Sequence, residues 1–517
     1  MLPRSKKFVV FSAVAIVLIA IVVPTVFYVY PSLFGAEEDK FYVGVTYCGN
    51  NFEDAKVLID KVKDYTNLFV VQSDSFQWND TKLEKACDYA VNSGLDIIVY
   101  FGYNSPTPTS NATEFINTAP ERYGSHFLGV YYGDEPGGKM LDSPQGMMAT
   151  VQLYPTSSQN FRNVTMKSPD GTIRTNQAYT DENFSNSTTT TFSPSGEITM
   201  YKIDRLSIGK NSTEYLKRII YQPNGTITYS ENIFDQVEND SSEPKVVSIG
   251  PFTFKPDGTV QDEKGNRVTD QGDISQFTPY QQVLDSNPLQ NPTKTADVYT
   301  KSQRTILSQV KNQSYQLFTS DYALYWWDYK GGYDTVFAQL GWNNTVAQEI
   351  GLVRGAANLQ GKDWGTIITW KYDQNPYLAS GDEVYQQMKV SYECGAKYVI
   401  IFNYSEDMTG PHGTLREEHF QALERFWNEV VQNNGVVHGG IKAEAALVLP
   451  ADYGWGMRNP QDTIWGLWKP DSVSQQIWTQ LQSKLEQYGS KLDIVYDDPA
   501  YPVAGKYSQV YYWNQTS

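Results

Sequence analysis

Short apolar runs alternate with amphipathic segments along most of this chain, and the alternation limits the folds that it can adopt. A short apolar run is typical of a buried strand, whereas apolar residues that recur with the period of a helical turn indicate a helix. Strands that alternate with helices form parallel sheets, and eight such units close a barrel. The sequence therefore predicts an α/β fold, a (β/α)8 TIM-type barrel, built from residues 40–138 and 295–434.

The predicted strands fall into two groups of four. They cover Phe41–Tyr47, Leu68–Gln72, Leu95–Phe101 and Phe127–Tyr132, and then Ala323–Trp327, Thr335–Leu340, Gly365–Trp370 and Tyr398–Phe402. The predicted helices include Phe52–Tyr65, Lys82–Ser93, Val346–Gln360, Glu383–Cys394 and Leu415–Asn433. An open doubly wound sheet is the alternative, although no GxGxxG or Walker loop follows any of these strands.

Residues 140–294 interrupt the alternation after the fourth strand and are rich in Ser, Thr and Asn. A Pro-x-Gly turn that precedes a β-branched residue recurs there, at Pro169, Pro194, Pro223 and Pro256. Such turns join antiparallel strands, so we predict an inserted β-hairpin-rich domain, either a meander or a small β-sandwich. The insertion would either cover a site at the end of the fourth strand or serve as a glycosylated decoration.

Residues 440–517 follow a third pattern, which predicts a small C-terminal α/β module. Its expected elements are strands at Ala445–Pro450, Leu492–Tyr496 and Gln509–Trp513 and a helix at Ser472–Tyr488. A loop unusually rich in Trp, residues 452–468, follows the first of these strands. Only this loop suggests a separate activity for the module.

The N-terminal residues 1–36 have the pattern of a short cytoplasmic tip and a transmembrane anchor. Residues 8–30 carry no charge, basic residues precede them at 4–7, and acidic residues follow at 37–39. At about 1.5 Å per residue this segment would span roughly 34 Å, enough to cross a lipid bilayer. The positive-inside rule then predicts a single-pass protein of the cell membrane, with a cytoplasmic N-terminus and residues 31–517 extracellular. A cleavable signal peptide is the alternative.

Composition agrees with an exported protein. The net charge of −17 argues against nucleic acid as a partner, because its phosphates would be repelled. Twelve N-x-Ser/Thr sequons occur, half of them between Asn163 and Asn239, so we expect that segment to be exposed. Cys48, Cys87 and Cys394 are odd in number and far apart, which predicts buried free thiols, with a Cys48–Cys87 pair as the alternative.

The clearest functional signal ends the predicted fourth strand. Residues 126–138 read HFLGVYYGDEPGG, so Asp134 and Glu135 follow the apolar run directly. In a parallel barrel the reacting groups lie at the carboxyl ends of the strands. We therefore expect Glu135 to act as a general acid/base, and Asp134 to raise its pKa or orient a substrate group. An ordinary acidic turn is the alternative.

The other strand ends are rich in carboxylates, amides and aromatic rings. We predict a second catalytic carboxylate at Asp328, after an aromatic run, with Asp74, Glu406 and Asp373 as the alternatives. The residues expected to bind substrate are Asp74, Tyr103, Trp327, Trp342, Trp370, Tyr372, Asn403, Tyr404 and Glu406. Aromatic rings stack on sugar faces and few basic groups are present for a phosphate, so the predicted ligand is a carbohydrate. Four His without metal-ligand spacing predict neither a metal nor a cofactor.

A carboxylic acid at the end of the fourth strand resembles the glycoside hydrolase barrels, whose general acid/base commonly lies there. The adjacent Asp134 and Glu135 also resemble the substrate-assisted hexosaminidases, in which the Asp orients the substrate acetamido group and the Glu protonates the leaving oxygen. This resemblance implies a membrane-anchored extracellular glycoside hydrolase that acts on a polysaccharide or glycan, with Glu135 as the acid.

One feature departs from this family. The large retaining clan places a nucleophilic Glu at the end of strand seven, but residues 369–373 here read TWKYD and contain no Glu. Two carboxylates are normally required for glycoside hydrolysis. This departure, together with the dense sequons, favours the alternative: a non-catalytic cell-surface protein that binds glycans or builds an envelope layer on a degenerate barrel.

Overall fold

The computed structural model of the chain describes residues 40–76, 80–102, 110–143, 149–156, 159–168, 170–208, 211–237, 245–342, 344–407 and 410–515. The chain divides into Met1–Tyr42 and Val43–Ser517, and the features below belong to the second unit. The predicted anchor, residues 8–30, lies outside the described residues. Within the described ranges no helix combines the length and the apolar character needed to cross a bilayer.

Eight parallel strands close into a barrel, which confirms the predicted TIM-type α/β fold. In order around the barrel they are β1 (Tyr42–Tyr47), β2 (Leu68–Val71), β3 (Asp96–Phe101), β4 (Phe127–Tyr132), β14 (Gln316–Asp321), β15 (Thr335–Leu340), β16 (Asp363–Ile368) and β17 (Tyr398–Ile401). Nearly every residue in these strands is buried, because one face points into the barrel and the other lies under helices.

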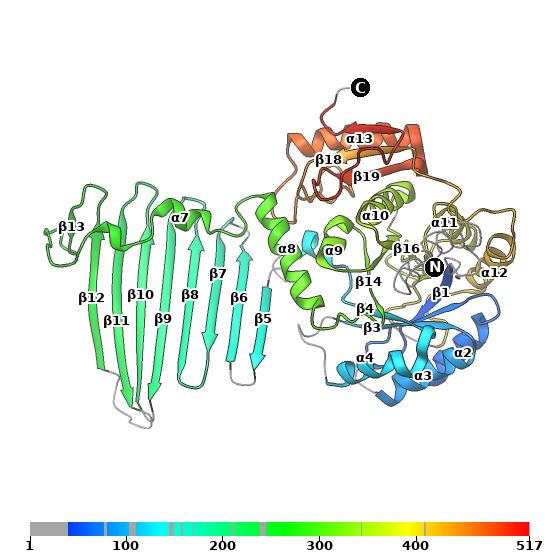
Figure 1. Cartoon of the computed structure of the whole chain (residues 1–517), viewed down its shortest axis with the longest axis horizontal. Coiled ribbons are helices and arrows are strands. Elements are labelled where there is room, and N and C mark those ends of the chain that lie inside the picture. Colours follow the sequence, from blue (N-terminus) through cyan, green and yellow to red (C-terminus); the bar gives the residue numbers. More distant parts are fainter. Residues whose placement is uncertain are drawn as a thin grey trace, which may run out of the picture. The chain divides into compact units, whose positions relative to one another are not determined.

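Helices surround the barrel (Figure 1). They are α2 (Phe52–Val62), α3 (Asp80–Asn92), α4 (Ser110–Tyr123), α8 (Pro292–Leu307), α9 (Tyr325–Gly331), α10 (Val346–Gln360), α11 (Gly381–Glu393) and α12 (Glu417–Phe426). The three cysteines are buried free thiols, as predicted, and Cys48 follows β1 directly.

The fifth barrel strand differs from its prediction. The predicted strand Ala323–Trp327 is wrong, because β14 ends at Asp321 and Tyr325 begins α9. β14 ends with the polar residues Thr319, Ser320 and Asp321. It therefore lacks the apolar run that is typical of a buried strand. These three side chains are buried because each has a hydrogen-bond partner inside the protein.

The chain between β4 and α8 forms a nine-stranded antiparallel meander in a single layer (Figure 1). Its strands are β5 (Ala149–Thr156), β6 (Gln159–Lys167), β7 (Ile173–Thr180), β8 (Phe184–Phe192), β9 (Ile198–Ile208), β10 (Asn211–Tyr221), β11 (Ile227–Val237), β12 (Lys245–Phe254) and β13 (Val260–Gln261). The turn glycines Gly171, Gly196, Gly225 and Gly258 all have positive φ, which explains the repeated Pro-x-Gly phrase.

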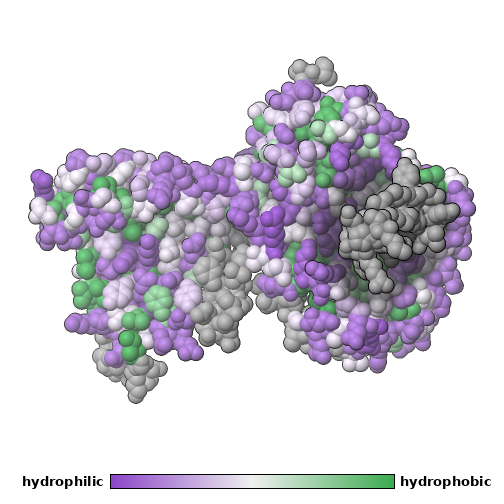
Figure 2. Space-filling model, in the orientation of Figure 1, coloured by the Kyte–Doolittle hydropathy of each residue, from purple (hydrophilic) through white to green (hydrophobic). Residues whose placement is uncertain are grey.

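Among the described side chains, this sheet has a small core at the end that carries the Pro-x-Gly turns. Apolar residues near the Pro-x-Gly turns, such as Ile198 and Phe254, are buried. The chain that returns from β13 packs there: Phe277 lies 4.9 Å from the Phe254 ring, and Tyr280 in α7 (Tyr280–Asp285) donates to Gly196 O at 2.8 Å. Elsewhere the visible surface of the sheet is mostly polar with scattered apolar residues (Figure 2).

The C-terminal module contains a three-stranded parallel sheet in the order β19-β18-β20. Its elements are β18 (Ala445–Leu449), α13 (Ser472–Tyr488), β19 (Leu492–Tyr496) and β20 (Gln509–Tyr512). The module packs closely on α10, since a Cβ added to Gly351 would lie 2.7 Å from Leu492 O. Between α10 and β19, the buried Arg354 donates from Nε to Asp493 Oδ1 at 2.7 Å.

Candidate active site in the barrel mouth

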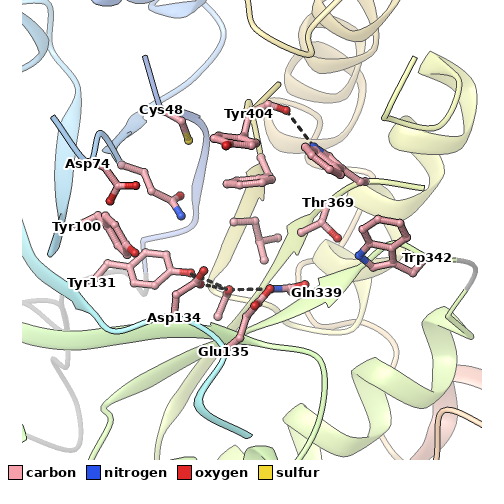
Figure 3. Close-up of a pocket in the computed structure, with 15 residues that line it drawn as sticks. Cys48, Asp74, Tyr100, Tyr131, Asp134, Glu135, Gln339, Trp342, Thr369 and Tyr404 are labelled. Atoms are coloured by element: carbon pink, nitrogen blue, oxygen red, sulfur yellow. Dashed lines mark hydrogen bonds between the residues drawn. The ribbon is translucent and has the colours of Figure 1, made fainter. Parts of the chain in front are cut away.

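A cavity of about 350 Å³ opens at the carboxyl ends of the barrel strands (Figure 3). The residues that line it are Cys48, Gln72, Asp74, Tyr100, Tyr131, Asp134, Glu135, Ser320, Gln339, Trp342, Ile367, Thr369, Trp370, Phe402 and Tyr404. Three of these side chains are carboxylates, and none of the described lining residues is Lys, Arg or His. The cavity therefore carries negative charge that its own walls do not neutralise.

Two hydroxyl groups orient Asp134. Tyr131 donates to Asp134 Oδ1 at 2.5 Å, and Ser320 donates to the same oxygen at 3.1 Å. Tyr131 belongs to β4 and Ser320 to β14, which are neighbours in the barrel although the inserted sheet separates them in sequence. The network thus joins two distant parts of the chain at the floor of the cavity.

Glu135 lies at the N-terminal end of the short helix α5 (Pro136–Asp142), in a left-handed conformation with φ 55°. Gln339 Nε2 donates to Glu135 Oε1 at 2.7 Å and to Ser320 Oγ at 3.0 Å, so it links Glu135 to the Asp134 network. Burial raises the pKa of Glu135, and the charge of Asp134 raises it further. A carboxyl group that stays protonated closer to neutral pH is suited to general acid catalysis.

Asp321 holds the backbone that carries Glu135. Its Oδ2 accepts from Gly137 N at 2.5 Å, and its Oδ1 accepts from Gly138 N at 2.8 Å. Both glycines are required for this approach, since a Cβ on Gly137 would lie 2.4 Å from Ala323 O. Burial raises the pKa of Asp321 to about 7, although these backbone donors oppose the rise.

Asp321→Asn is expected to loosen α5 without changing any side chain that lines the cavity. An amide has only one oxygen, so its NH2 group must face the N–H of either Gly137 or Gly138. Two donors then face each other, and a buried donor without an acceptor costs about 1–3 kcal/mol. Hydrogen exchange of the α5 amides should therefore become roughly 10-fold faster or more. The exposed Asp64 provides the control variant Asp64→Asn. Unchanged exchange in Asp321→Asn would show that other contacts hold α5.

A second buried carboxyl group, Glu349 in α10, makes stability depend on pH. Its side chain accepts from Tyr325 Oη at 2.5 Å, and burial raises its pKa from 4.5 to about 8. The folded protein thus keeps a proton that the unfolded chain has released, so this group lowers stability as the pH rises from about 4.5 to about 8.

Glu349→Gln should therefore flatten the pH dependence of stability. We expect the free energy of unfolding to fall less between about pH 5 and pH 8 than in the wild type, by at most about 1.4 kcal/mol per pH unit. Urea unfolding at several pH values measures this slope. Glu121→Gln, at an exposed position of α4, should keep the wild-type slope. Equal slopes in Glu349→Gln and the wild type would contradict the assignment.

The structure separates Trp327 and Asp328 from the cavity. Both are fully buried in α9, where the Trp327 ring lies 4.4 Å from the Tyr496 ring of the C-terminal module. Asp328 Oδ1 accepts from Tyr299 Oη at 2.6 Å. Their predicted position at the end of the fifth strand is wrong, because that strand ends earlier, at Asp321.

The other predicted residues divide between the cavity and its surroundings. Asp74, Trp342, Trp370 and Tyr404 line the cavity together with Asp134 and Glu135. Tyr372 and Glu406 are exposed and Asn403 is buried, with its Oδ1 accepting from Thr414 N at 2.9 Å. None of these three lines the described cavity. Tyr103 lies outside the described residues.

Several lining residues were not among the predicted catalytic or substrate-binding residues, although a simple signal marks them. The penultimate residue of five successive barrel strands lines the cavity: Tyr100, Tyr131, Ser320, Gln339 and Ile367. Side chains alternate between the inside and the outside of a barrel, so the same position in each strand reaches the same layer. Counting back from each strand end would have found this layer, provided that β14 was placed correctly.

No family model and no curated protein matches this chain. Within the described residues no group of His, Cys, Asp and Glu side chains is arranged to hold a metal ion.

Proposed function

We propose that the protein is a glycoside hydrolase that acts on a polysaccharide or glycan, with Glu135 as its general acid. The observation that carries this proposal is the setting of Glu135, a half-buried carboxyl group with a raised pKa at the end of the fourth barrel strand. Glycoside hydrolysis requires a carboxylic acid that protonates the leaving oxygen. Gln339 holds one oxygen of the Glu135 carboxyl group, and this donor opposes part of the rise in its pKa.

Asp134 and Asp74 are the candidates for the second carboxylate. Both line the cavity, and after burial the charge of Asp134 is the main cause that raises the pKa of Asp74. Tyr131 and Ser320 fix Asp134, so it suits the orientation of a substrate group. Asp74 is exposed to solvent, so it can meet either a water molecule or a charged substituent of the substrate.

Aromatic rings provide a surface for the sugar. Trp370 stacks on Tyr404 with ring centres 5.7 Å apart, and its Nε1 donates to Tyr404 O at 2.9 Å. Trp342, whose ring centre lies 6.1 Å from that of Trp370, is 49% exposed and can meet an incoming ligand. Rings of this kind offer an apolar face to the C–H groups of a sugar, and they supply no charge for a phosphate.

We also propose that the cavity faces the cell exterior. The uncharged residues 8–30, with basic residues before them and acidic residues after them, support a bilayer anchor, and the sequons support export. Protease added to intact cells should then digest residues 31–517. Full protection of that part of the chain would contradict this location.

Turnover of a panel of oligosaccharides by the full-length protein tests the proposed reaction. The panel should contain neutral, N-acetylated and amine-bearing sugars, with release of reducing ends as the readout. Turnover by the wild type that Glu135→Gln abolishes would support the proposal. Binding without turnover, retained when both Asp134 and Glu135 are replaced, would favour the non-catalytic glycan-binding protein. Neither binding nor turnover would contradict both functions.

A further inference from the structure

We propose that the cavity binds a sugar that carries a free amino group, with the ammonium held between Asp74 and Asp134. The inference rests on the proposed function and narrows its substrate class from carbohydrates in general to amino sugars that are not acetylated. Three observations support it: the charge of the cavity, two buried polar atoms without partners among the described residues, and the arrangement of polar and aromatic side chains.

The charge of the cavity calls for a cation. Asp74, Asp134 and Glu135 line it, and none of the described lining residues is basic. Lys139, in the first turns of α5, donates its ammonium group to the main-chain oxygen of Asp134 at 2.6 Å. Burial raises the pKa of both Asp74 and Glu135, and repulsion from Asp134 raises both further, whereas Lys139 opposes the rise at Glu135. A bound ammonium would relieve this repulsion, whereas a uronic or sialic acid would increase it.

Two buried polar atoms in the cavity wall point to a polar ligand: Gln72 Oε1 accepts hydrogen bonds, and the Thr369 hydroxyl can accept or donate them. Gln72 is 8% exposed and Thr369 is 6% exposed, and both line the cavity. Gln72 Oε1 and Thr369 Oγ1 have no hydrogen-bond partner among the described residues. Buried polar atoms are normally paired, so a ligand is expected to supply their partners. An ammonium group offers three donors, whereas the amide of an acetylated sugar offers one and no charge.

The cavity walls match the two faces of a sugar ring. In Figure 3, Asp74, Asp134 and the two tyrosines Tyr100 and Tyr131 lie on one side, and Trp342 lies on the other. A sugar ring that stacks against Trp342 would direct its substituents toward the carboxylates on the other side. The volume of about 350 Å³ is at the small end of the range for small-molecule sites, which suits a terminal sugar unit.

Binding measurements in the full-length Glu135→Gln protein, which is expected to leave the sugar intact, test this inference. Glucosamine and N-acetylglucosamine oligosaccharides of equal length are titrated by calorimetry near pH 6, where the amine is charged, and near pH 9. At the lower pH we expect the glucosamine oligosaccharide to bind at least about 10-fold more tightly, as one close charge pair can provide. The preference should disappear at the higher pH and weaken with salt.

Asp74→Asn, added to the Glu135→Gln protein, should weaken binding of the glucosamine oligosaccharide about 10-fold. The affinity for the acetylated oligosaccharide should stay unchanged. The added variant Glu121→Gln, far from the cavity lining, should change neither. Equal affinity for both sugars, or an equal loss of affinity for both in Asp74→Asn, would overturn the amino-sugar inference. The proposed hydrolysis would still stand in that case if the wild type turned over neutral sugars. A preference for the amine without turnover by the wild type would support the inference and overturn the reaction. Binding of Ca²⁺ alone, with no sugar bound, would overturn the inference in favour of a cation site.

Discussion

Glu135→Gln is expected to lower kcat for glycoside hydrolysis by about 10²–10⁴-fold, because an amide cannot deliver a proton to the leaving oxygen. The substitution keeps the shape of the side chain and an oxygen that can accept from Gln339 Nε2, so folding and sugar binding should persist. The loss should depend on the leaving group. Aryl glycosides with an acidic phenol need little protonation and should be far less affected than oligosaccharides.

The pH profile gives an independent readout of the same group. A general acid works only while it is protonated, so wild-type activity should fall as the pH rises through the raised pKa of Glu135. This descending limb should be missing from the residual activity of Glu135→Gln toward aryl glycosides. Glu121→Gln should match the wild type in both measurements. Full activity of Glu135→Gln toward oligosaccharides would exclude Glu135 as the acid.

Arg354→Met is expected to reduce the free energy of unfolding by about 3–5 kcal/mol, because it leaves the carboxylate of Asp493 buried without its cation. The side chain of Asp493 is inaccessible to solvent and would keep only the hydroxyl of Tyr507, at 3.0 Å. The loss is a large share of the stability of a typical domain, about 5–15 kcal/mol. Urea unfolding followed by tryptophan fluorescence measures it.

A double variant separates this effect from a general loss of packing. Arg354→Met combined with Asp493→Leu removes both charges and should recover part of the lost stability, since apolar replacements of a buried pair are often neutral. The rest is not recovered, because the main-chain oxygens of Ser490 and Leu492 still lose the guanidinium. Lys301→Met breaks the exposed ion pair with Asp297 and should change the stability by less than about 1 kcal/mol. A comparably small change in Arg354→Met would contradict the prediction.

Loss of the C-terminal module would also disturb the proposed site. Arg458, in the loop of this module, pairs with Asp142 of α5 at 2.9 Å. A Cβ on Gly466 of the same loop would lie 2.3 Å from Met140 O, so the loop packs directly on α5. The helix that begins after Glu135 is thus held from one side by Asp321 and from the other by this loop. Two of the three tryptophans of the loop, Trp455 and Trp465, are buried and serve packing.

Parts of the barrel were predictable because hydrophobic burial alone produces them. Phe127–Tyr132 and Thr335–Leu340 were predicted at their observed bounds, since a mostly apolar run is typical of a strand buried on both faces. β14 was missed because Thr319, Ser320 and Asp321 are buried through hydrogen bonds, which a hydropathy pattern does not record. The Pro-x-Gly turns predicted hairpins, but no local pattern distinguished a single layer from a sandwich.

Some residues of the candidate site were likewise predictable from local sequence, and others were not. The positions of Asp134 and Glu135 followed from one strand end and the geometry of a parallel barrel. The placement of Asp328 failed with the misplaced fifth strand. Ser320 and Asp321 could not be found locally, because their roles depend on β14 lying beside β4, and this pairing involves residues that are distant in sequence.

The seam between β4 and β14 has a consequence for how the chain reaches its native state. Gly129 pairs with Gln316 and Tyr131 with Phe318, although the whole nine-stranded sheet lies between them in sequence. Contacts between residues so distant in sequence form late, because closing the long intervening loop costs conformational entropy before the contacts can compensate for it. The hydrogen bonds from Tyr131 and Ser320 to Asp134 cross this seam. We therefore expect the acidic site to be assembled only in the final stage of folding, after the inserted sheet has brought its two ends together.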